Sequence, residues 1–161
     1  MLETLKIRKK YRSSDLMNVL NFIQKYSDSD FYLTSDNKRF SVTTTQLLKK
    51  LLSESLVTFV DKNEDNDITG LVLVWKSNGE NTRYYIKLVA DSPKTAARLL
   101  TQINWNVEPV LYMKIAKHSK FVNTFQSKGF RFFGGRGSQI LLRRDKTIIP
   151  KLTFQREEED E

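Results

Sequence analysis

Residues 68–90 constrain the fold of this 161-residue chain more than any other segment, because they combine two strand patterns, a turn and a stop. Residues 68–75 and 82–90 are rich in β-branched and aromatic side chains, and the polar stretch 77–81 between them is typical of a hairpin turn. Asp91-Ser92-Pro93 then ends the second strand and begins a helix, since serine caps helices and proline is tolerated in a first helical turn. A strand pair that leads directly into a helix predicts a sheet with helices packed on it.

Apolar residues at helical spacing predict four helices in total. They are expected at 14–26, from the capping threonines 43–45 onward, from Pro93 to about residue 104, and at 119–128, where a glycine follows. Their predicted buried faces are Leu16, Val19, Leu20, Ile23 and Tyr26; Leu47, Leu48, Leu51 and Leu52; Ala96, Leu99, Leu100 and Ile103; and Phe121, Val122 and Phe125.

Further strands are predicted by short alternating or β-branched stretches. They are expected at 5–7, 56–60, 109–115, 130–133 and 138–144, with a glycine turn at Gly134-Gly135 before the last strand. Residues 27–42 are polar and mixed, which predicts a long irregular connection, and the acidic stretch 61–67 predicts a turn.

The order of these elements indicates an α/β (α+β) fold. Hairpins that alternate with helices predict a mixed, mostly antiparallel sheet of six to seven strands, flanked by about four helices. The length fits one domain, expected over 1–155, and the acidic stretch 156–161 is expected to be a disordered tail.

Composition excludes several classes of site. The chain has no cysteine, which excludes thiolate metal sites, disulfides and a cysteine nucleophile, and it has one histidine, His118, too few for a multi-histidine metal site. We therefore expect no metal. The sequence has no run of about 18 apolar residues, and no apolar stretch follows the first positive charges, so we expect a cytoplasmic protein without membrane contact.

Positive charge is concentrated in the second half of the chain. Residues 81–155 contain 14 Lys and Arg against three Asp and Glu, whereas residues 1–80 contain 12 against 11. A cationic surface of this kind attracts nucleic acid, acidic proteins or phosphorylated small molecules. The alternative interpretation is a solvated surface that keeps the protein soluble.

Three segments resemble the GNAT acetyltransferases. LKIRKKYRSSDLMNVLNFI at the start is similar to that family's first strand and helix, ITGLVLVWKSNGENTRYYIKLVA to its central hairpin, and HSKFVNTFQSKGFRFF to the helix before its last hairpin. The resemblance covers residues 5–144 and implies the GNAT fold, with acetyl-coenzyme A bound where two neighbouring strands splay apart.

The resemblance also implies which residues hold the cofactor. The pantetheine would pair with the strand that contains Leu88, Val89 and Ala90, and the pyrophosphate would sit at the start of the next helix, on Lys94, Thr95, Ala96, Ala97 and Arg98. The family's phosphate loop reads Arg/Gln-x-x-Gly-x-Gly/Ala. In this chain the matching residues run from Asp91 to Ala96. Asp91 stands where the family has Arg or Gln, and Lys94 stands where the family has its first glycine.

Candidate catalytic residues are His118 and Tyr85. Many family members have a tyrosine four residues before the glycine of Gly-Phe as general acid, but this chain has Phe125 there. His118 has the one side chain with an ordinary pKa near neutrality, so it is the candidate acid or base, and Tyr85 is a candidate site residue on the central strand. An exposed histidine at a helix start, next to Lys117 and Lys120, is the alternative interpretation.

Two weaker motifs have structural alternatives. Residues 61–67 partly imitate a calcium loop but lack its central glycine and final glutamate, which favours a turn. The stretch 132–139 resembles an arginine–glycine nucleic-acid element beside Phe132 and Phe133, whereas a hairpin turn needs the same glycines.

The sequence thus leaves three functions open, of which the third is a structural or regulatory subunit in which the cleft is vestigial. The first is an acetyl-coenzyme-A-dependent N-acetyltransferase that acts on an amine of a protein or small molecule. The alternative is a degenerate GNAT-fold binding module without catalysis, whose basic half, residues 81–155, binds nucleic acid or an acidic protein partner.

Overall fold

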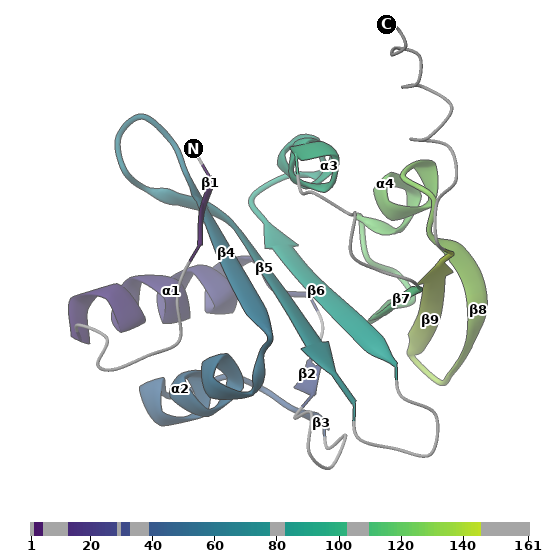
Figure 1. The fold of residues 1–161 in the computed structure, drawn as a ribbon, viewed down its shortest axis with the longest axis horizontal. Coiled ribbons are helices and arrows are strands. Elements are labelled where there is room, and N and C mark those ends of the chain that lie inside the picture. The colour runs from purple at the N-terminus through teal and green to yellow at the C-terminus, as the bar shows by residue number, and fades with distance from the viewer. Residues whose placement is uncertain are drawn as a thin grey trace, which may run out of the picture.

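The fold is a seven-stranded mixed sheet with two helices on each face (Figure 1). The computed structural model describes residues 2–4, 13–28, 30–32, 39–77, 83–102 and 110–145. In chain order the elements are β1 (Leu2–Thr4), α1 (Ser13–Tyr26), β2 (Phe31–Tyr32), β3 (Arg39–Phe40), α2 (Thr45–Glu54), β4 (Val57–Lys62), β5 (Ile68–Lys76), β6 (Tyr84–Ala90), α3 (Pro93–Gln102), β7 (Leu111–Ala116), α4 (Val122–Ser127), β8 (Arg131–Arg136) and β9 (Gln139–Arg144).

The large sheet has the strand order β1-β4-β5-β6-β7-β9-β8, and β2 and β3 form a separate small ladder. Each neighbouring pair in the large sheet is antiparallel except β6 and β7, which are parallel because α3 connects them. This confirms the predicted mixed, mostly antiparallel sheet flanked by helices.

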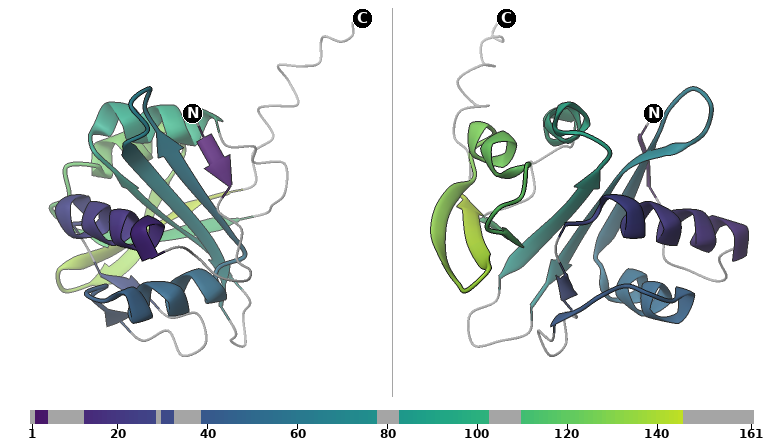
Figure 2. Two further views of the ribbon diagram at one scale, coloured as in Figure 1. Left: turned by 90° about the vertical axis from the view of Figure 1, so that its left-hand side faces the viewer. Right: turned by 180° about the vertical axis from the view of Figure 1, so that it is seen from behind.

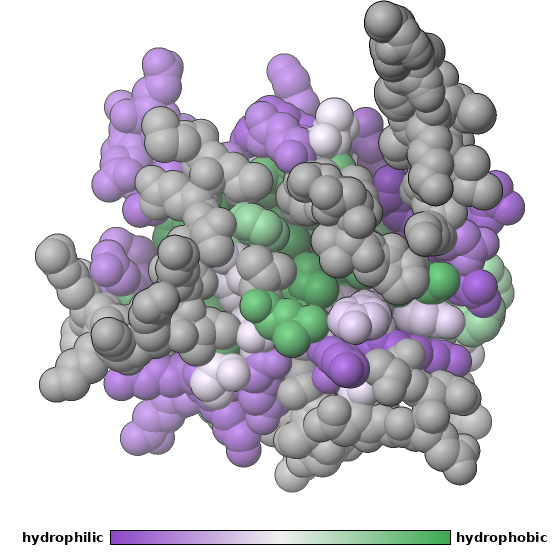
Figure 3. Space-filling model, in the orientation of Figure 1, coloured by the Kyte–Doolittle hydropathy of each residue, from purple (hydrophilic) through white to green (hydrophobic). Residues whose placement is uncertain are grey.

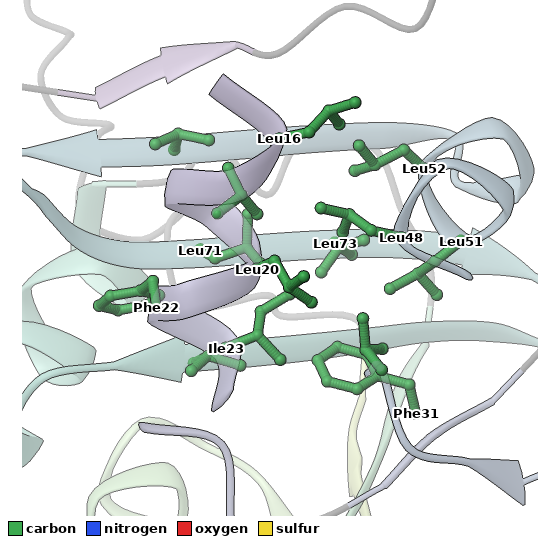
Figure 4. Packing of buried hydrophobic residues seen from close by; sticks show 14 of the residues in the cluster. Leu16, Leu20, Phe22, Ile23, Phe31, Leu48, Leu51, Leu52, Leu71 and Leu73 are labelled. Carbon is green, nitrogen blue, oxygen red and sulfur yellow. The ribbon is translucent and has the colours of Figure 1, made fainter. Parts of the chain in front are cut away.

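Two apolar cores hold the helices on opposite faces of the sheet (Figure 2). In the first core, α1 and α2 pack on β4, β5 and β6; Figure 4 shows leucines of both helices converging on Leu71 and Leu73. In the second core, α3 and α4 pack on the residues of β5, β6 and β7 that point the other way, since successive side chains of a strand alternate between faces. A group of apolar residues also shows in the middle of the view of Figure 3, among hydrophilic residues.

Local sequence explains where the helices of the first core begin and which faces they bury. Leu16, Val19, Leu20 and Ile23 of α1 are buried at the predicted spacing. The α2 helix begins after Thr44, whose Oγ1 accepts a hydrogen bond from the N–H of Leu47 at 3.1 Å. None of the helices in the described parts of the chain has the length and apolar character that crossing a bilayer would need.

Three details of the sequence prediction are wrong or fall outside the described residues. Residues 27–42 are not entirely irregular, because they contain the β2–β3 ladder. The last hairpin turns at Gly137 and Ser138 rather than at Gly134-Gly135, because Gly134 and Gly135 belong to β8 and pair with β9 across a bulge. The strand expected at 5–7 lies outside the described residues, and β1 occupies Leu2–Thr4 instead.

The beginning of α4 also differs from the prediction. The helix begins at Val122, not at Ser119, because the Ser119 hydroxyl accepts the N–H of Phe121 at 3.0 Å within the preceding turn. The helix ends at Ser127, one residue before the predicted end, and the turn after it reaches Gly129, whose φ of 101° favours glycine.

Helix α3 approaches β5 most closely at Gly70. A Cβ on Gly70 would meet the Cδ1 of Leu99 well inside contact distance, and Leu99 is fully buried. The missing side chain therefore sets how near α3 lies to the sheet, and with it where the helix begins after β6.

We expect Gly70→Ala to lower the free energy of unfolding by about 1–3 kcal/mol through overpacking. The measurement is urea unfolding followed by circular dichroism. Leu99→Ala alone should cost about 2–5 kcal/mol, but the double variant should cost clearly less than the sum, because the new methyl group fills part of the cavity. Gly134→Ala is the matched control, since a Cβ there has no neighbour within 4 Å. Additive costs would contradict the contact.

Candidate functional site

In the described part of the sheet, two neighbouring strands separate from each other. Strands β6 and β7 pair only through Tyr84 with Leu111 and Tyr85 with Tyr112. Beyond these pairs β6 continues to Ala90 against β5, and β7 continues against β9, so each strand keeps its other neighbour. The result is a wedge-shaped gap that opens toward the carboxyl ends of two parallel strands. This is the edge of a sheet at which α/β proteins commonly bind ligands.

Side chains of the protein fill most of this gap. The remaining cavity has a volume of about 10 Å³. Its lining residues come from β6, β7, the turn before α4, α4 itself and the segment after α1: Asp28, Lys87, Leu88, Met113, Lys114, Ile115, Phe121 and Phe125. The side chain of Phe125 is 1% exposed, and the centre of its ring lies 6.0 Å from the centre of the Phe121 ring. A ligand can therefore enter the gap only if some of these side chains move.

A hydrogen bond joins two segments that line the gap. The hydroxyl of Ser119, in the turn between β7 and α4, donates to the Asp28 carboxylate, which follows α1. Helix α1 belongs to the first core and α4 to the second, so this bond joins segments from opposite faces of the sheet.

A buried lysine lies beside the gap on β6. Lys87 is 5% exposed, and its Nζ lies 5.2 Å from the centre of the Phe31 ring. Burial lowers its pKa from the ordinary 10.5 to about 8, although the nearby carboxylates of Asp28 and Asp30 act in the opposite direction. Asp30 in turn accepts hydrogen bonds from Arg39 Nε at 2.9 Å and from the Ser41 hydroxyl at 2.8 Å.

A second lysine faces Lys87 from the other side of the gap. Lys114 on β7 is half-buried, and its Nζ lies 5.2 Å from the centre of the Tyr85 ring. Burial lowers its pKa, and the positive charge of Arg83 lowers it further. The gap is therefore flanked by two amines that are easier to deprotonate than ordinary lysines.

The start of α3 lies at the carboxyl end of β6, next to the gap. Ser92 caps the helix: its Oγ accepts the N–H of Thr95 at 3.2 Å, and Pro93 has no N–H to offer. Asp91 adds a carboxylate whose Oδ1 is buried without a hydrogen-bond partner. In the first turn, the N–H of Lys94 is therefore the one that the Ser92 cap does not use. A helix start without a capping side chain and without the Asp91 carboxylate would offer an anion more N–H groups and less repulsion.

Arg98 of α3 is engaged elsewhere. Its Nη2 lies 2.6 Å from Oδ2 of Asp61, which is 1% exposed on β4, and its Nη1 donates to Gln102 at 3.1 Å. Burial would raise the pKa of Asp61, but hydrogen bonds from Arg98 and Thr69 bring it below its ordinary value. Arg98 therefore ties α3 to β4, on the side of the helix away from β7 in strand order.

The structure does not bring the two candidate catalytic residues together. Tyr85 pairs with Tyr112 at the start of β7, and its ring is buried between those of Trp75 and Tyr112. His118 is exposed in the turn after Ala116. Ala116 itself lies four residues beyond Tyr112, or about 13 Å at the rise of a strand. His118 therefore lies at the open end of the gap and Tyr85 at its closed end.

The other predicted cofactor residues follow β6 into α3. Leu88 and Ala90 belong to the second core and Val89 to the first, so the segment is buried on both faces. Ala96 is fully buried beneath the helix, Thr95 and Ala97 are half-buried, and Lys94 is exposed. Among the predicted cofactor residues, Lys94 has an exposed, positively charged side chain at the start of α3, next to the gap.

A larger cavity lies outside the gap. It measures about 680 Å³ and is lined by polar and apolar residues of α1, β4, β5 and the β4–β5 turn, together with Asp91. In that turn the Asn63 side chain accepts the N–H groups of Asp65 and Asp67, so the predicted turn is present at residues 63–67, whereas Asp61 and Lys62 belong to β4. Within the described residues, no group of three acidic or histidine side chains could hold a metal ion.

Comparison with known proteins identifies the fold. No protein-family profile matches the sequence, and a search of curated proteins finds no significant match. Among solved structures, the GNAT domain of PAT from S. lividans superposes with a TM-score of 0.63 at 10% identity, covering 90% of this chain and 89% of that one.

Two further structures give the same result. An N-acetyltransferase from Staphylococcus aureus Mu50 has a TM-score of 0.61 at 14% identity, covering 90% and 97% of the two chains. A variant of spermidine N-acetyltransferase from Vibrio cholerae has a TM-score of 0.59 at 14% identity, covering 98% and 99%. The chain therefore has the GNAT fold, as the sequence resemblance predicted.

Sequence reasoning missed the polar residues around the gap. Lys87 carried a readable signal, because it interrupts an otherwise apolar strand, YYIKLVA, and a lysine in such a strand must be buried or lie at an edge. The bond between Asp28 and Ser119 carried none, since 91 positions separate the two residues.

We expect the stability of the protein relative to Lys87→Met to rise with pH. The folded pKa, about 8, lies below the unfolded value near 10.5, so between these values the unfolded chain holds a proton that the folded protein has released. The wild type should therefore gain roughly 3 kcal/mol on the variant between pH 7 and pH 10.5, with little change below pH 7. Urea unfolding at each pH measures this, with exposed Lys120→Met as control. A pH-independent difference would contradict the lowered pKa.

Proposed function

We propose that the protein is an acetyl-coenzyme-A-dependent N-acetyltransferase acting on an amine of a protein or small molecule. The observation that supports this most is the separation of β6 from β7 directly before α3, within a fold shared with acetyltransferases over nine-tenths of the chain. The edge of β6 beyond Tyr85, where its ladder with β7 has ended, suits an extended ligand with amide groups, because such a ligand can pair with it as an added strand.

The residues present fit the cofactor in part. The strand edge at Leu88, Val89 and Ala90 would hold the pantetheine, and Lys94 with its backbone amide would meet the phosphates. Asp91 opposes them by repulsion. Phe121, Phe125 and Lys87 would have to yield room, since the free volume is about 10 Å³.

When bound, the cofactor would supply an acyl group activated as a thioester. The chain itself would polarise the acyl carbonyl through backbone N–H groups of β6. His118 at the open end of the gap would take the proton of the acceptor amine through water, because an imidazole can act as a general base. Tyr85 would hold the closed end of the gap through its ring contacts.

We expect acetyl-coenzyme A and coenzyme A to raise the melting temperature and ATP to leave it unchanged. A ligand at about 100 times its Kd adds roughly 2.7 kcal/mol, which corresponds to several degrees for a domain of this size. Asp91→Asn should tighten binding by removing the repulsion, and Lys94→Glu should weaken it about tenfold or more. Lys49→Glu, an exposed site on α2, is the control for the same charge change.

Activity separates catalysis from binding. In an acceptor screen that detects released thiol, His118→Ala should lower kcat while the thermal shift with coenzyme A persists. Absence of a shift with saturating coenzyme A and acetyl-coenzyme A would overturn the proposal.

A second candidate function is a GNAT-fold binding module without catalysis. Three observations favour it: Phe125 in place of a proton donor, the capped start of α3 beside Asp91, and the filled gap. Such a module would bind its partner through the basic half, residues 81–155. Its expected result in the thermal-shift experiment is an unchanged melting temperature with coenzyme A and acetyl-coenzyme A.

A further inference from the structure

One row of side chains crosses the sheet on the face of the first core, at the paired end of β6 and β7. Cross-strand partners follow one another from Trp75 on β5 to Tyr85 on β6, Tyr112 on β7 and Arg143 on β9. Residues opposite one another in register share a face, so these side chains form a continuous row. The rings of Trp75 and Tyr85 are stacked with centres 5.8 Å apart, and those of Tyr85 and Tyr112 are also 5.8 Å apart.

The row ends in a cluster of two rings and two guanidinium groups, which we term the arginine–aromatic cluster: Arg83, Tyr112, Phe133 and Arg143. The rings of Tyr112 and Phe133 pack edge to face, with their centres 5.6 Å apart. Arg83 lies 4.4 Å from the centre of the Tyr112 ring and 5.9 Å from that of Phe133. Arg143 lies 5.0 Å from the Phe133 ring and 5.9 Å from the Tyr112 ring. These distances are those of cation–π contacts.

The cluster lies beyond the part of the sheet that α1 and α2 cover. Those helices pack over β4, β5 and β6, whereas the cluster stands mainly on β7, β8 and β9 (Figures 1 and 2). Phe133 is 45% exposed, although it is a large apolar side chain, and the side chain of Arg143 is 35% exposed. Phe133 is therefore an apolar surface that stacking on a ligand would bury.

The charges around the cluster are mostly positive. Lys114 and Arg131 are further cations in the same part of the sheet, Arg131 being the partner of Arg143 in the β8–β9 register. Asp145 is the acidic group in contact, with Oδ1 2.7 Å from Arg143 Nε, and it is exposed. A guanidinium group has five N–H donors, so one that lies near a ring can still donate hydrogen bonds to an anion.

We propose that the arginine–aromatic cluster binds single-stranded nucleic acid. Exposed rings on a sheet face stack on unpaired bases, and adjacent guanidinium groups bind the phosphates between them. A duplex hides its base faces and would meet only the positive charge, whereas an acidic peptide would leave Phe133 without a stacking partner. The binding uses no cofactor and so does not depend on acetyl transfer.

The test measures the affinity of the protein for a labelled twelve-nucleotide oligo-U or oligo-dT, and for a duplex of the same length, by fluorescence anisotropy at about 50 mM salt. We expect the single strand to bind more tightly than the duplex. Phe133→Leu should weaken single-strand binding about tenfold while leaving duplex binding almost unchanged, and Phe133→Trp should preserve it, because the indole still stacks. Phe133 is largely exposed, so these variants should keep the wild-type melting temperature.

Charge variants complete the experiment. Arg83→Gln with Arg143→Gln should weaken binding and reduce the slope of log K against log salt by about 1.4, the value for two phosphate contacts on a single strand. Lys49→Gln with Lys50→Gln removes the same charge from exposed positions of α2 and should have little effect. Equal affinity for duplex, equal loss in the α2 variant, or no effect of Phe133→Leu would overturn the proposal.

Discussion

The separation of β6 from β7 after two residue pairs is the constraint on which the rest of the site depends. Each strand keeps a full partner on its other side, β6 with β5 over seven pairs and β7 with β9 over six, so each remains in the sheet where the gap opens. The space must then be filled by side chains or by a ligand, because a well-packed protein leaves few voids. In this structure Phe121, Phe125 and Lys87 fill it, and the Asp28–Ser119 bond joins segments on its two sides.

Charge at the gap follows from the same separation. Lys87 pairs in register with Leu73, and Lys114 with Leu141, so both lysines point to the first-core face on either side of the gap. Burial makes their protonated forms costly, and the carboxylates of Asp28 and Asp30 offset part of this cost at Lys87. The acidic segment after α1 is thus held near the gap by electrostatics as well as by the hydrogen bond to Ser119.

Periodicity predicted the elements well but not the contacts between them. The faces of α1, α2 and α3 were readable, because their buried residues recur every three or four positions. The last turn was misassigned since Gly134, Gly135 and Gly137 all have turn chemistry, and only the bulge in register shows which of them turns. The engagement of Arg98 with Asp61 had no local signal, because 37 positions separate them.

The aromatic row also could not be predicted from local sequence, because Trp75, Tyr85 and Tyr112 become neighbours only through the register of three strands. Strand β6 carries both features of interest: Tyr85 at its paired end belongs to the aromatic row, and Ile86 to Ala90 border the gap. Pairing with β7 fixes the first end, whereas filling of the gap at the second end depends on side chains that can change rotamer. The proposed binding at the arginine–aromatic cluster would therefore need no opening of the gap, whereas the proposed cofactor binding would. The paired end of β6 and β7 at Tyr84 and Tyr85 would keep the two proposed sites separate on one strand.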